Sequence, residues 1–262
     1  MVRTAVQLYT LRALGESLPS LLARVGTTAF DGVEFAGFGE TSAERTRSVL
    51  EAETLTPAGA HVGVESLEDD PDGVASFYGA IECRRLVVPY LDETHFESAS
   101  AVCETAARLE TLARRWEKRG FDLAYHNHDH EFAALDGGEE AGGVAANEDE
   151  EGRSAFELFA DESGPALSIE LDVGWAVAAG YDPVELLERL DGRVPLVHLK
   201  DVDAADGRPV ELGEGDVDPS ACAAAARDAG TEWLIYEHDD PDDPAASLER
   251  GAEALDALRD GS

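Results

Sequence analysis

Short apolar segments alternate with longer amphipathic segments along almost the whole chain. Eight of the short segments are rich in Val, Ile, Leu, Ala and Tyr, which is typical of buried strands. The longer segments repeat apolar residues every three or four positions and carry many acids, as expected for helices that pack one face on a sheet. The predicted strands cover residues 4–9, 32–36, 57–63, 85–89, 121–127, 167–172, 194–199 and 232–237.

The strand–helix alternation predicts an α/β fold built around a parallel sheet. Eight repeats favour a closed (β/α)8 TIM barrel, and 262 residues are close to the usual length of such a domain. An open, doubly wound sheet is the alternative, but no GxGxxG follows the first predicted strand. We therefore expect residues 1–262 to form a single TIM barrel domain.

One segment interrupts the alternation after the fifth predicted strand. Residues 136–153, DGGEEAGGVAANEDEEGR, consist largely of glycine, alanine and acids, with almost no large apolar side chain. Such a composition cannot bury enough apolar surface to form a packed element. It predicts a flexible acidic insertion on the surface of the barrel.

The chain is strongly acidic, with 56 Asp and Glu against 20 Lys and Arg and a net charge of −36. This charge repels nucleic acids and anionic lipid surfaces, so neither is an expected partner. Only two of the basic residues are lysines, Lys118 and Lys200. This composition resembles that of proteins from halophilic archaea. The sequence has no apolar run long enough to cross a membrane and no signal peptide, so we expect a cytoplasmic protein.

Polar side chains stand where the predicted strands end. In a parallel barrel, the carboxyl ends of the strands meet on one face, where active sites are built. Side chains two positions apart point to the same side of a strand. The residues at these ends are Gln7, Tyr9, Glu34, His61, His126, His128, Glu170, Asp172, His198 and Glu237. Imidazoles and carboxylates that converge from several rigid strands predict a site for a divalent cation.

Several of these residues also have a structural interpretation. A single buried histidine usually serves only in the packing and hydrogen bonding of a core, and His61 and Glu34 can equally form a hydrogen-bond network at the barrel mouth. Lys200 can stabilise oxyanion charge or form a salt bridge with Asp172 or Asp201. It is the number of such residues, on several strands, that favours a functional site.

Five motifs, taken in order, resemble a known family. They are YHNHDHEF at 125–132, ELDVGWAVAAGYDP at 170–183, VHLKD at 197–201, LGEGDVD at 212–218 and LIYEHD at 234–239. Together they are similar to the xylose isomerase-like TIM barrels, the sugar phosphate isomerase/epimerase superfamily, and within it to YHNH-type members. QLYTLR at 7–12 and GVEFAGFG at 32–39 resemble the first two strands of that family.

The resemblance implies one divalent metal ion held by the fifth to eighth strands, usually by Glu, Asp, His and Glu. Asp172, His198 and Glu237 match the last three of these positions. His126 stands at the fifth-strand glutamate, and Trp175 stands where many members have a second histidine. An imidazole in the fifth-strand position favours Mn, Zn or Co, although Mg remains compatible.

The chemistry that the resemblance implies is removal of a proton next to a carbonyl, through an enediolate. We expect Glu237 to act as base, His128 to carry a second proton and Lys200 to stabilise oxyanion charge. Glu170, or less favourably Glu131, supplies a second carboxylate. The residues expected to contact a small-molecule carbohydrate are Gln7, Tyr9, Glu34, His61 and Trp175.

The sequence predicts a metal-dependent sugar or sugar phosphate isomerase or epimerase. A dehydratase or lyase acting on a keto-sugar or inosose is the main alternative, because it shares the proton abstraction. An enzyme resembling endonuclease IV is disfavoured by the charge of −36. A sugar-binding protein without catalysis is the remaining alternative, and a homo-oligomer is left open.

Overall fold

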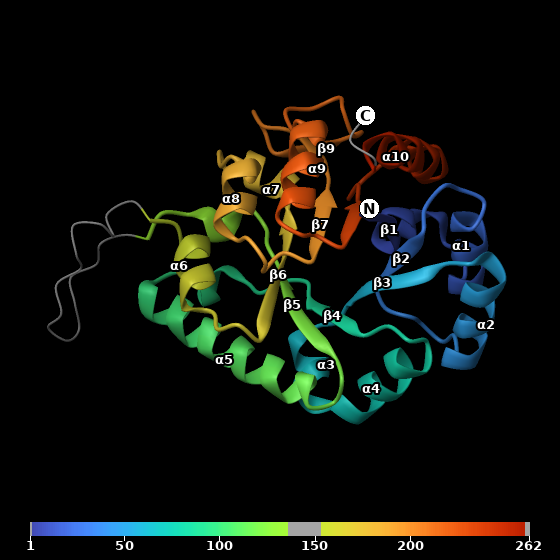
Figure 1. Cartoon of the computed structure of the whole chain (residues 1–262), viewed down its shortest axis with the longest axis horizontal. Coiled ribbons are helices and arrows are strands. Elements are labelled where there is room, and N and C mark those ends of the chain that lie inside the picture. The colour runs from blue at the N-terminus through green and yellow to red at the C-terminus, as the bar shows by residue number, and fades with distance from the viewer. Residues whose placement is uncertain (1, 136–152, 260–262) are drawn as a thin grey trace, which may run out of the picture.

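The computed structural model describes residues 2–135 and 153–259, which form a closed barrel of eight parallel strands enclosed by helices (Figure 1). The predicted TIM barrel is confirmed, and the open-sheet alternative is wrong because β1 pairs with both β2 and β10. In order around the barrel, the strands are β1 (Arg3–Gln7), β10 (Trp233–Tyr236), β7 (Leu196–Leu199), β6 (Leu167–Asp172), β5 (Asp122–His126), β4 (Arg85–Val88), β3 (Thr56–His61) and β2 (Gly32–Phe35).

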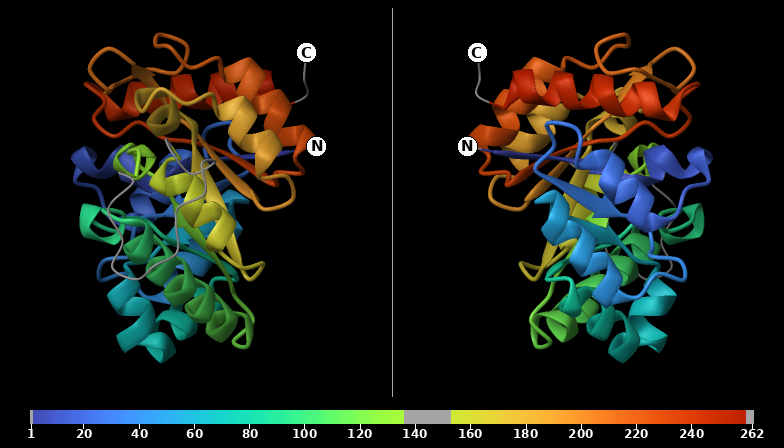
Figure 2. Two further views of the ribbon diagram at one scale, coloured as in Figure 1. Left: turned by 90° about the vertical axis from the view of Figure 1, so that its left-hand side faces the viewer. Right: turned by 90° about the vertical axis from the view of Figure 1, so that its right-hand side faces the viewer.

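Helices cover the outside of the barrel on all sides (Figure 2). The last of them, α10, packs against β1 and the turn that follows it, so the two ends of the described chain lie side by side. The helices are α1 (Leu18–Val25), α2 (Ala43–Glu53), α3 (Val64–Asp69), α4 (Pro71–Ala80), α5 (Ala99–Glu117), α6 (Ala155–Glu162), α7 (Val173–Ala178), α8 (Pro183–Arg189), α9 (Pro219–Asp228) and α10 (Pro244–Leu258), with 3-10 turns η1 (Leu8–Leu14), η2 (Glu93–His95) and η3 (His130–Phe132).

A small hairpin was not predicted from the sequence. Strands β8 (Asp201–Asp203) and β9 (Arg208–Val210) pair antiparallel directly after β7. Each is three residues long, and both are too short and too polar to produce an alternating pattern. The hairpin lies at the catalytic face of a TIM barrel, beyond the carboxyl end of a barrel strand.

The interior of the barrel has an apolar floor and a polar top. The floor is a separate cluster of buried residues that includes Ala5, Ala124, Leu196 and Ile235. Two positions further along the same four strands, on the same side, stand the polar residues of the predicted site. These are Gln7, His126, His198 and Glu237, all buried. The strand period therefore places the polar side chains in one layer above a closed core.

Some predicted strands end one or two residues too late. The first strand stops at Gln7, whose side chain accepts a hydrogen bond from the Tyr9 N–H and so begins η1. The third stops at His61 instead of residue 63. The predicted acidic insertion falls almost wholly on residues 136–152, which lie outside the described residues.

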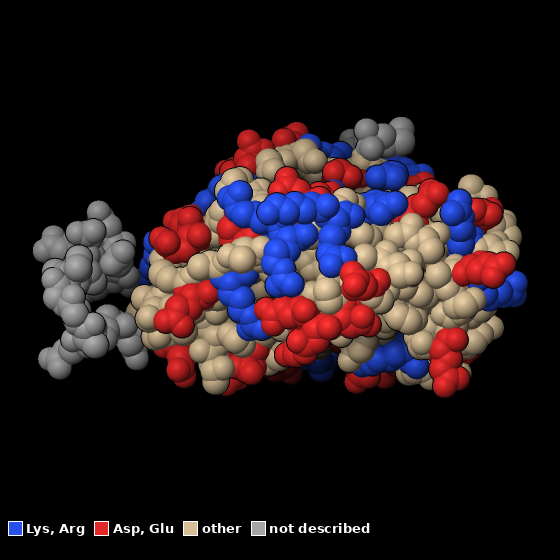
Figure 3. Space-filling model, turned by 90° about the horizontal axis from the view of Figure 1, so that it is seen from below, with Lys and Arg blue, Asp and Glu red and all other residues tan. Residues whose placement is uncertain are grey.

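Charged side chains of both signs are interspersed on the surface, as one face shows (Figure 3). Many arginines are paired with acids. Arg108 lies 2.8 Å from Glu68, and Arg119 lies 2.8 Å from Asp72. Such exposed pairs each contribute only about 0–1 kcal/mol, and less at high salt. No helix among the described residues has the length and apolar character needed to span a bilayer.

Candidate metal and active site

The register of the parallel strands sets the height of each polar side chain in the barrel. His126 on β5 lies beside Glu170 on β6, while Asp172 lies beside His198 on β7. Glu237 follows the last residue of β10, the strand that pairs with β7. These five side chains therefore come from four neighbouring strands and converge at one mouth of the barrel.

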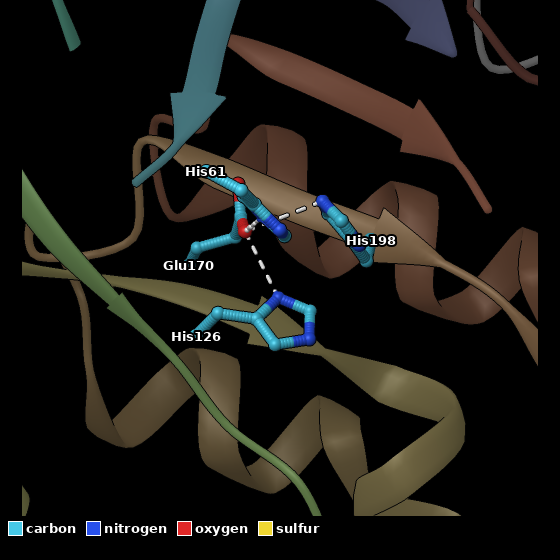
Figure 4. A group of neighbouring side chains, drawn as sticks. All are labelled: His61, His126, Glu170 and His198. Carbon is cyan, nitrogen blue, oxygen red and sulfur yellow. Dashed lines mark hydrogen bonds and ion pairs between the residues drawn. The ribbon is translucent and has the colours of Figure 1, made fainter. Parts of the chain in front are cut away.

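Glu170 lies at the centre of three imidazoles (Figure 4). Its Oε2 atom is 2.9 Å from His126 Nδ1, 2.8 Å from His61 Nε2 and 3.3 Å from His198 Nε2. Burial alone would raise the pKa of this carboxyl, but His198 and His61 outweigh burial and hold the pKa well below its usual range. Glu170 is therefore a carboxylate, as the sequence prediction requires.

Two overlapping groups of side chains could hold a cation. In each, one ligand atom per residue lies within 4.8 Å of all the others. The first contains His61, His126, Glu170 and His198, and the second contains His126, Asp172, His198 and Glu237. The second group is the ligand set predicted from the sequence, which the structure brings together.

The contacts of His126 favour the second group. Burial lowers the pKa of this imidazole, so the ring is neutral and carries one N–H. That N–H is on Nδ1, because a carboxylate oxygen of Glu170 lies 2.9 Å away and can only accept. The lone pair is then on Nε2, which lies 3.8 Å from Asp172 Oδ2. A carboxylate that orients a histidine in this way is common around protein-bound metals.

Asp172 uses its two oxygens differently. Oδ1 accepts a hydrogen bond of 2.8 Å from the Trp175 N–H and so caps the first turn of α7. Oδ2 faces the site, 3.4 Å from Lys200 Nζ. Asn127 fixes the backbone of Asp172, accepting from its N–H at 2.9 Å and donating to its C=O at 3.2 Å. The asparagine of the HNH sequence thus holds the end of β6 beside the end of β5.

Lys200 is fully buried among acids. Nζ lies 3.4 Å from Asp172 and 3.4 Å from Glu237, and it also forms an ion pair with Asp239. Burial disfavours the ammonium, but these three carboxylates outweigh burial and raise its pKa. Its Nζ also lies 4.3 Å from the centre of the Trp175 ring, a cation–π contact. The predicted salt bridge with Asp172 is present, while the carboxylate of Asp201 bonds backbone N–H groups instead.

His198 and Glu237 form a second charged pair. Nδ1 of His198 lies 3.0 Å from Glu237, and Nε2 lies 2.7 Å from Glu34. Burial opposes charge on this imidazole, but Glu170, Glu237 and Glu34 outweigh burial and raise its pKa well above the ordinary value. Burial likewise opposes charge on Glu237, but Lys200 and His198 lower its pKa well below the ordinary value.

Glu34 comes from β2, across the barrel from β6, and its side chain reaches His198. Gln7 donates to its Oε2 at 2.9 Å, and His61 Nε2 lies 3.4 Å away. Burial, with the nearby charge of Glu170, raises its pKa to about 7. Glu34 and His61 therefore lie in a polar network at the barrel mouth, as their structural interpretation predicted, and Gln7 joins it. Of the three, only His61 lines the cavity above.

Gly59 has no side chain, and the Glu34 carboxylate occupies the space next to it. A Cβ atom on Gly59 would lie 2.5 Å from Glu34 Oε1, too close for any side chain. We expect Gly59→Ala to reduce the free energy of unfolding by about 1–3 kcal/mol, measured by urea denaturation, because it overpacks this layer. In a Glu34→Ala background, Gly59→Ala should reduce the free energy of unfolding by clearly less. An equal cost in both backgrounds would show that Glu34 is not the group displaced.

A cavity of about 660 Å³ opens above the polar layer. Tyr9, His61, His126, His128, Trp175, Lys200 and Glu237 were predicted as site residues and line it. Burial, with the charges of His126 and Lys200, lowers the pKa of His128 to about 2, so this imidazole is neutral. Its ring stacks on Trp175 with 5.9 Å between ring centres.

Other residues of the cavity wall were not predicted as site residues: Ala36, Gly37, Pro89, Tyr90, Pro209, Asp239 and Asp240. Asp239 lies three residues beyond the end of β10, so the strand period does not reach it, but it is the last residue of the LIYEHD motif, which could have identified it. Tyr90 and Pro209 had no such signal, because each lies in a segment whose path depends on the fold. Pro209 reaches the cavity only because the β8–β9 hairpin folds back.

Glu131 does not belong to the site. It is fully buried, and its carboxylate accepts hydrogen bonds from the Tyr125 hydroxyl and the His128 N–H. The interpretation of Glu131 as the second carboxylate is therefore wrong. Its contacts fix the chain between β5 and η3, which positions His128 at the cavity.

The family model of the xylose isomerase-like TIM barrels matches residues 23–258. The chain belongs to this family. No match was found among curated proteins. Membership confirms the family predicted from the ordered motifs, while the YHNH-type subgroup stays a prediction.

Several solved structures of low sequence identity have the same fold. A sugar phosphate isomerase/epimerase from Parabacteroides distasonis has a TM-score of 0.80 and 21% identity, over 98% of this chain and 94% of that one. A probable 3-DHS dehydratase from Bacillus anthracis has a TM-score of 0.73 and 15% identity, over 97% and 99%. A D-allulose 3-epimerase from Methylomonas sp. has a TM-score of 0.67 and 14% identity, over 98% and 98%.

The residues present fit a divalent cation of the kind these families often use. The second group supplies two imidazoles and two carboxylates, and with both imidazoles neutral, as ligation requires, its formal charge of −2 would balance a dication. A cation would therefore have to displace the proton that His198 holds between Glu237 and Glu34. Within the described residues, Oε1 of Glu34 and Oε1 of Glu170 are buried without a hydrogen-bond partner. Such orphaned oxygens are costly unless a cation or a ligand satisfies them. Glu170 belongs to the first group and not to the second, so its free oxygen favours a ligand beside the proposed set, while the fit of the second group rests on its own donor atoms.

Proposed function

We propose that this protein is a divalent-metal-dependent sugar isomerase or epimerase that removes a proton next to a carbonyl and forms an enediolate. The observation that carries the proposal is the convergence of His126, Asp172, His198 and Glu237 beneath a 660 Å³ cavity. The names of the related structures, which include isomerases and epimerases, support the same reaction class.

His126, Asp172, His198 and Glu237 would hold the ion. When bound, it would polarise a substrate carbonyl and increase the acidity of the neighbouring C–H. An imidazole among the ligands favours Mn, Zn or Co over Mg.

Glu237 is the best placed base, because it is an ionised carboxylate that both borders the ion site and lines the cavity. His128 also lines the cavity, and its lowered pKa keeps the imidazole neutral, so it can hydrogen-bond the substrate but would carry a proton only when substrate binding raises that pKa. Lys200 stays charged and can stabilise the oxyanion that forms as the proton leaves.

Glu170 acts differently from the role predicted from the sequence. The Oε2 atom of Glu170 contacts three imidazoles, and the residue does not line the cavity. We assign Glu170 to orienting His126 and His198, and it is a positioning residue.

A dehydratase is the second candidate, because proton removal is shared and a dehydratase is among the related structures. The metal-loaded protein should be incubated in heavy water with a panel of ketoses and keto-inositols and followed by proton NMR and mass spectrometry. Deuterium at the carbon next to the carbonyl, with no change in mass other than the gain from exchange, supports the isomerase or epimerase. Loss of water indicates the dehydratase. Tight binding of a sugar without any exchange would contradict both enzymes and indicate a binding protein.

A further inference from the structure

Backbone N–H groups after β7 and β10 donate to the protein's own carboxylates. TIM barrels often bind substrate phosphate with the loops after the seventh and eighth strands and a nearby helix N-terminus. Here those strands are β7 and β10. The segment after β7 contains the glycine-rich stretch LGEGDVD at 212–218, which has the character of an anion-binding loop.

The side chain of Asp201 binds the backbone N–H groups of that loop. Its carboxylate accepts hydrogen bonds from the N–H groups of Gly213 at 2.8 Å, Gly215 at 3.0 Å and Val217 at 3.0 Å. A fourth comes from its neighbour Val202 at 2.9 Å. Asp201 is buried, so these donors are directed at a carboxylate within the fold and not at the cavity.

The helices that follow β7 and β10 are capped in the same way. Asp218 accepts from the Ser220 and Ala221 N–H groups, both at 3.0 Å, at the start of α9. Asp243 accepts from the Ala245 and Ala246 N–H groups, both at 3.1 Å, at the start of α10. Each carboxylate takes the place that a phosphate would need at a helix N-terminus.

The cavity itself is negatively charged. Lys200 is the one Lys or Arg among its lining residues, and three carboxylates already surround it. The carboxylates in and beneath the cavity are five, Glu170, Asp172, Glu237, Asp239 and Asp240, without counting Glu34. A divalent ion and Lys200 together supply three positive charges against these five carboxylates, so the loaded site remains negative with His61, His126 and His198 neutral.

Arg12 lies beside the cavity wall, against Tyr9 and Asp240, and these contacts already engage its charge. Its guanidinium stacks 3.9 Å from the centre of the Tyr9 ring, donates to the Tyr9 C=O at 3.1 Å and lies 3.9 Å from Asp240. The remaining wall contains Tyr9, Tyr90, Pro89 and Pro209. Such rings suit the C–H faces of a sugar and offer a phosphate no positive charge.

From these contacts we infer that the substrate of the proposed isomerase is an uncharged polyhydroxy carbonyl compound and not a sugar phosphate. This inference rests on the proposed function, and it specifies the chemical class of the molecule that enters the cavity. It differs from the name carried by the related isomerase/epimerase structures, which refers to sugar phosphates.

A matched pair of substrates tests the inference: D-fructose and D-fructose 6-phosphate, and likewise D-ribulose and D-ribulose 5-phosphate. The metal-loaded protein is assayed for α-proton exchange in heavy water and for binding by calorimetry, at low and at molar salt. We expect the neutral member of each pair to bind at least about tenfold more tightly, because like charges repel across the site. The ratio of the two affinities should decrease at molar salt, where charges are screened.

A pair of variants supplies the control. Asp240 lines the cavity, while Asp242 is an exposed acid of the same segment that does not. Asp240→Lys should raise phosphate binding relative to neutral sugar by about tenfold, and Asp242→Lys should leave the ratio unchanged. If the wild type prefers the phosphorylated sugars, the inference is overturned while the proposed function stands. If no sugar of either kind exchanges a proton or binds, the proposed function is contradicted and the inference with it.

Discussion

Asp172→Asn is expected to weaken binding of a divalent cation by more than about 100-fold while leaving the barrel folded. Loss of a group that only orients a ligand already costs about 10–100-fold, and Asp172 is a proposed ligand. Asparagine retains the oxygen that caps α7 through the Trp175 N–H, so the local fold should be kept. The measurements are elemental analysis of the purified protein and calorimetric titration with Mn, Zn and Co.

Asp182 provides the matched control for Asp172. It caps α8 through the Val184 N–H at 2.8 Å, and it lies outside the candidate metal groups. Asp182→Asn should bind the cation as tightly as the wild type. Asp172→Ala should lose both the cation and stability, because it also removes the cap, which is worth about 1 kcal/mol. Wild-type affinity in Asp172→Asn would contradict the proposed ligand set.

Glu237→Gln is expected to reduce α-proton exchange by about 10²–10⁴-fold, the range attributed to a positioned general base. Glutamine has nearly the same shape but cannot accept the proton at neutral pH. The exchange rate is measured by proton NMR in heavy water with a substrate identified from the panel. Metal content is measured in the same sample, because Glu237 is also a proposed ligand, and exchange is compared at saturating metal.

The control for Glu237 stands at the other end of the same strand. Glu232 precedes β10 and pairs with Arg85 at 3.0 Å on the opposite face of the barrel. Glu232→Gln should exchange protons at the wild-type rate. If Glu237→Gln keeps full exchange with metal bound, another group is the base, and His128 is the first to test.

The parts of the fold that depend on local pattern were predictable from the sequence. The eight barrel strands each have an apolar run, and the polar residue that ends a run falls in the top layer because side chains alternate along a strand. Alternation named ten such residues and predicted a cation site among them, and the resemblance to the family singled out His126, Asp172, His198 and Glu237 as its ligands. Their family motifs added the expectation that one cation joins them.

The parts that depend on tertiary packing were not predictable. Alternation suggests that Glu170 and Asp172 act together, but the register places Glu170 beside His126, so its Oε2 atom meets imidazoles. Glu131 had the same residue type as a catalytic acid, yet Tyr125 and the His128 N–H occupy its oxygens. The β8–β9 hairpin and Tyr90 reach the cavity through loop paths that no local pattern encodes.

The proposed ligands all lie on β5, β6, β7 and β10, which are consecutive around the barrel. The other half, β1 to β4, contributes Tyr9, Tyr90 and His61 to the cavity wall but none of the four ligands. Directed evolution toward new sugars can therefore vary one half of the barrel mouth while the half that supports the chemistry stays fixed. A library confined to the segments after β1 and β4 should retain metal loading in most of its members.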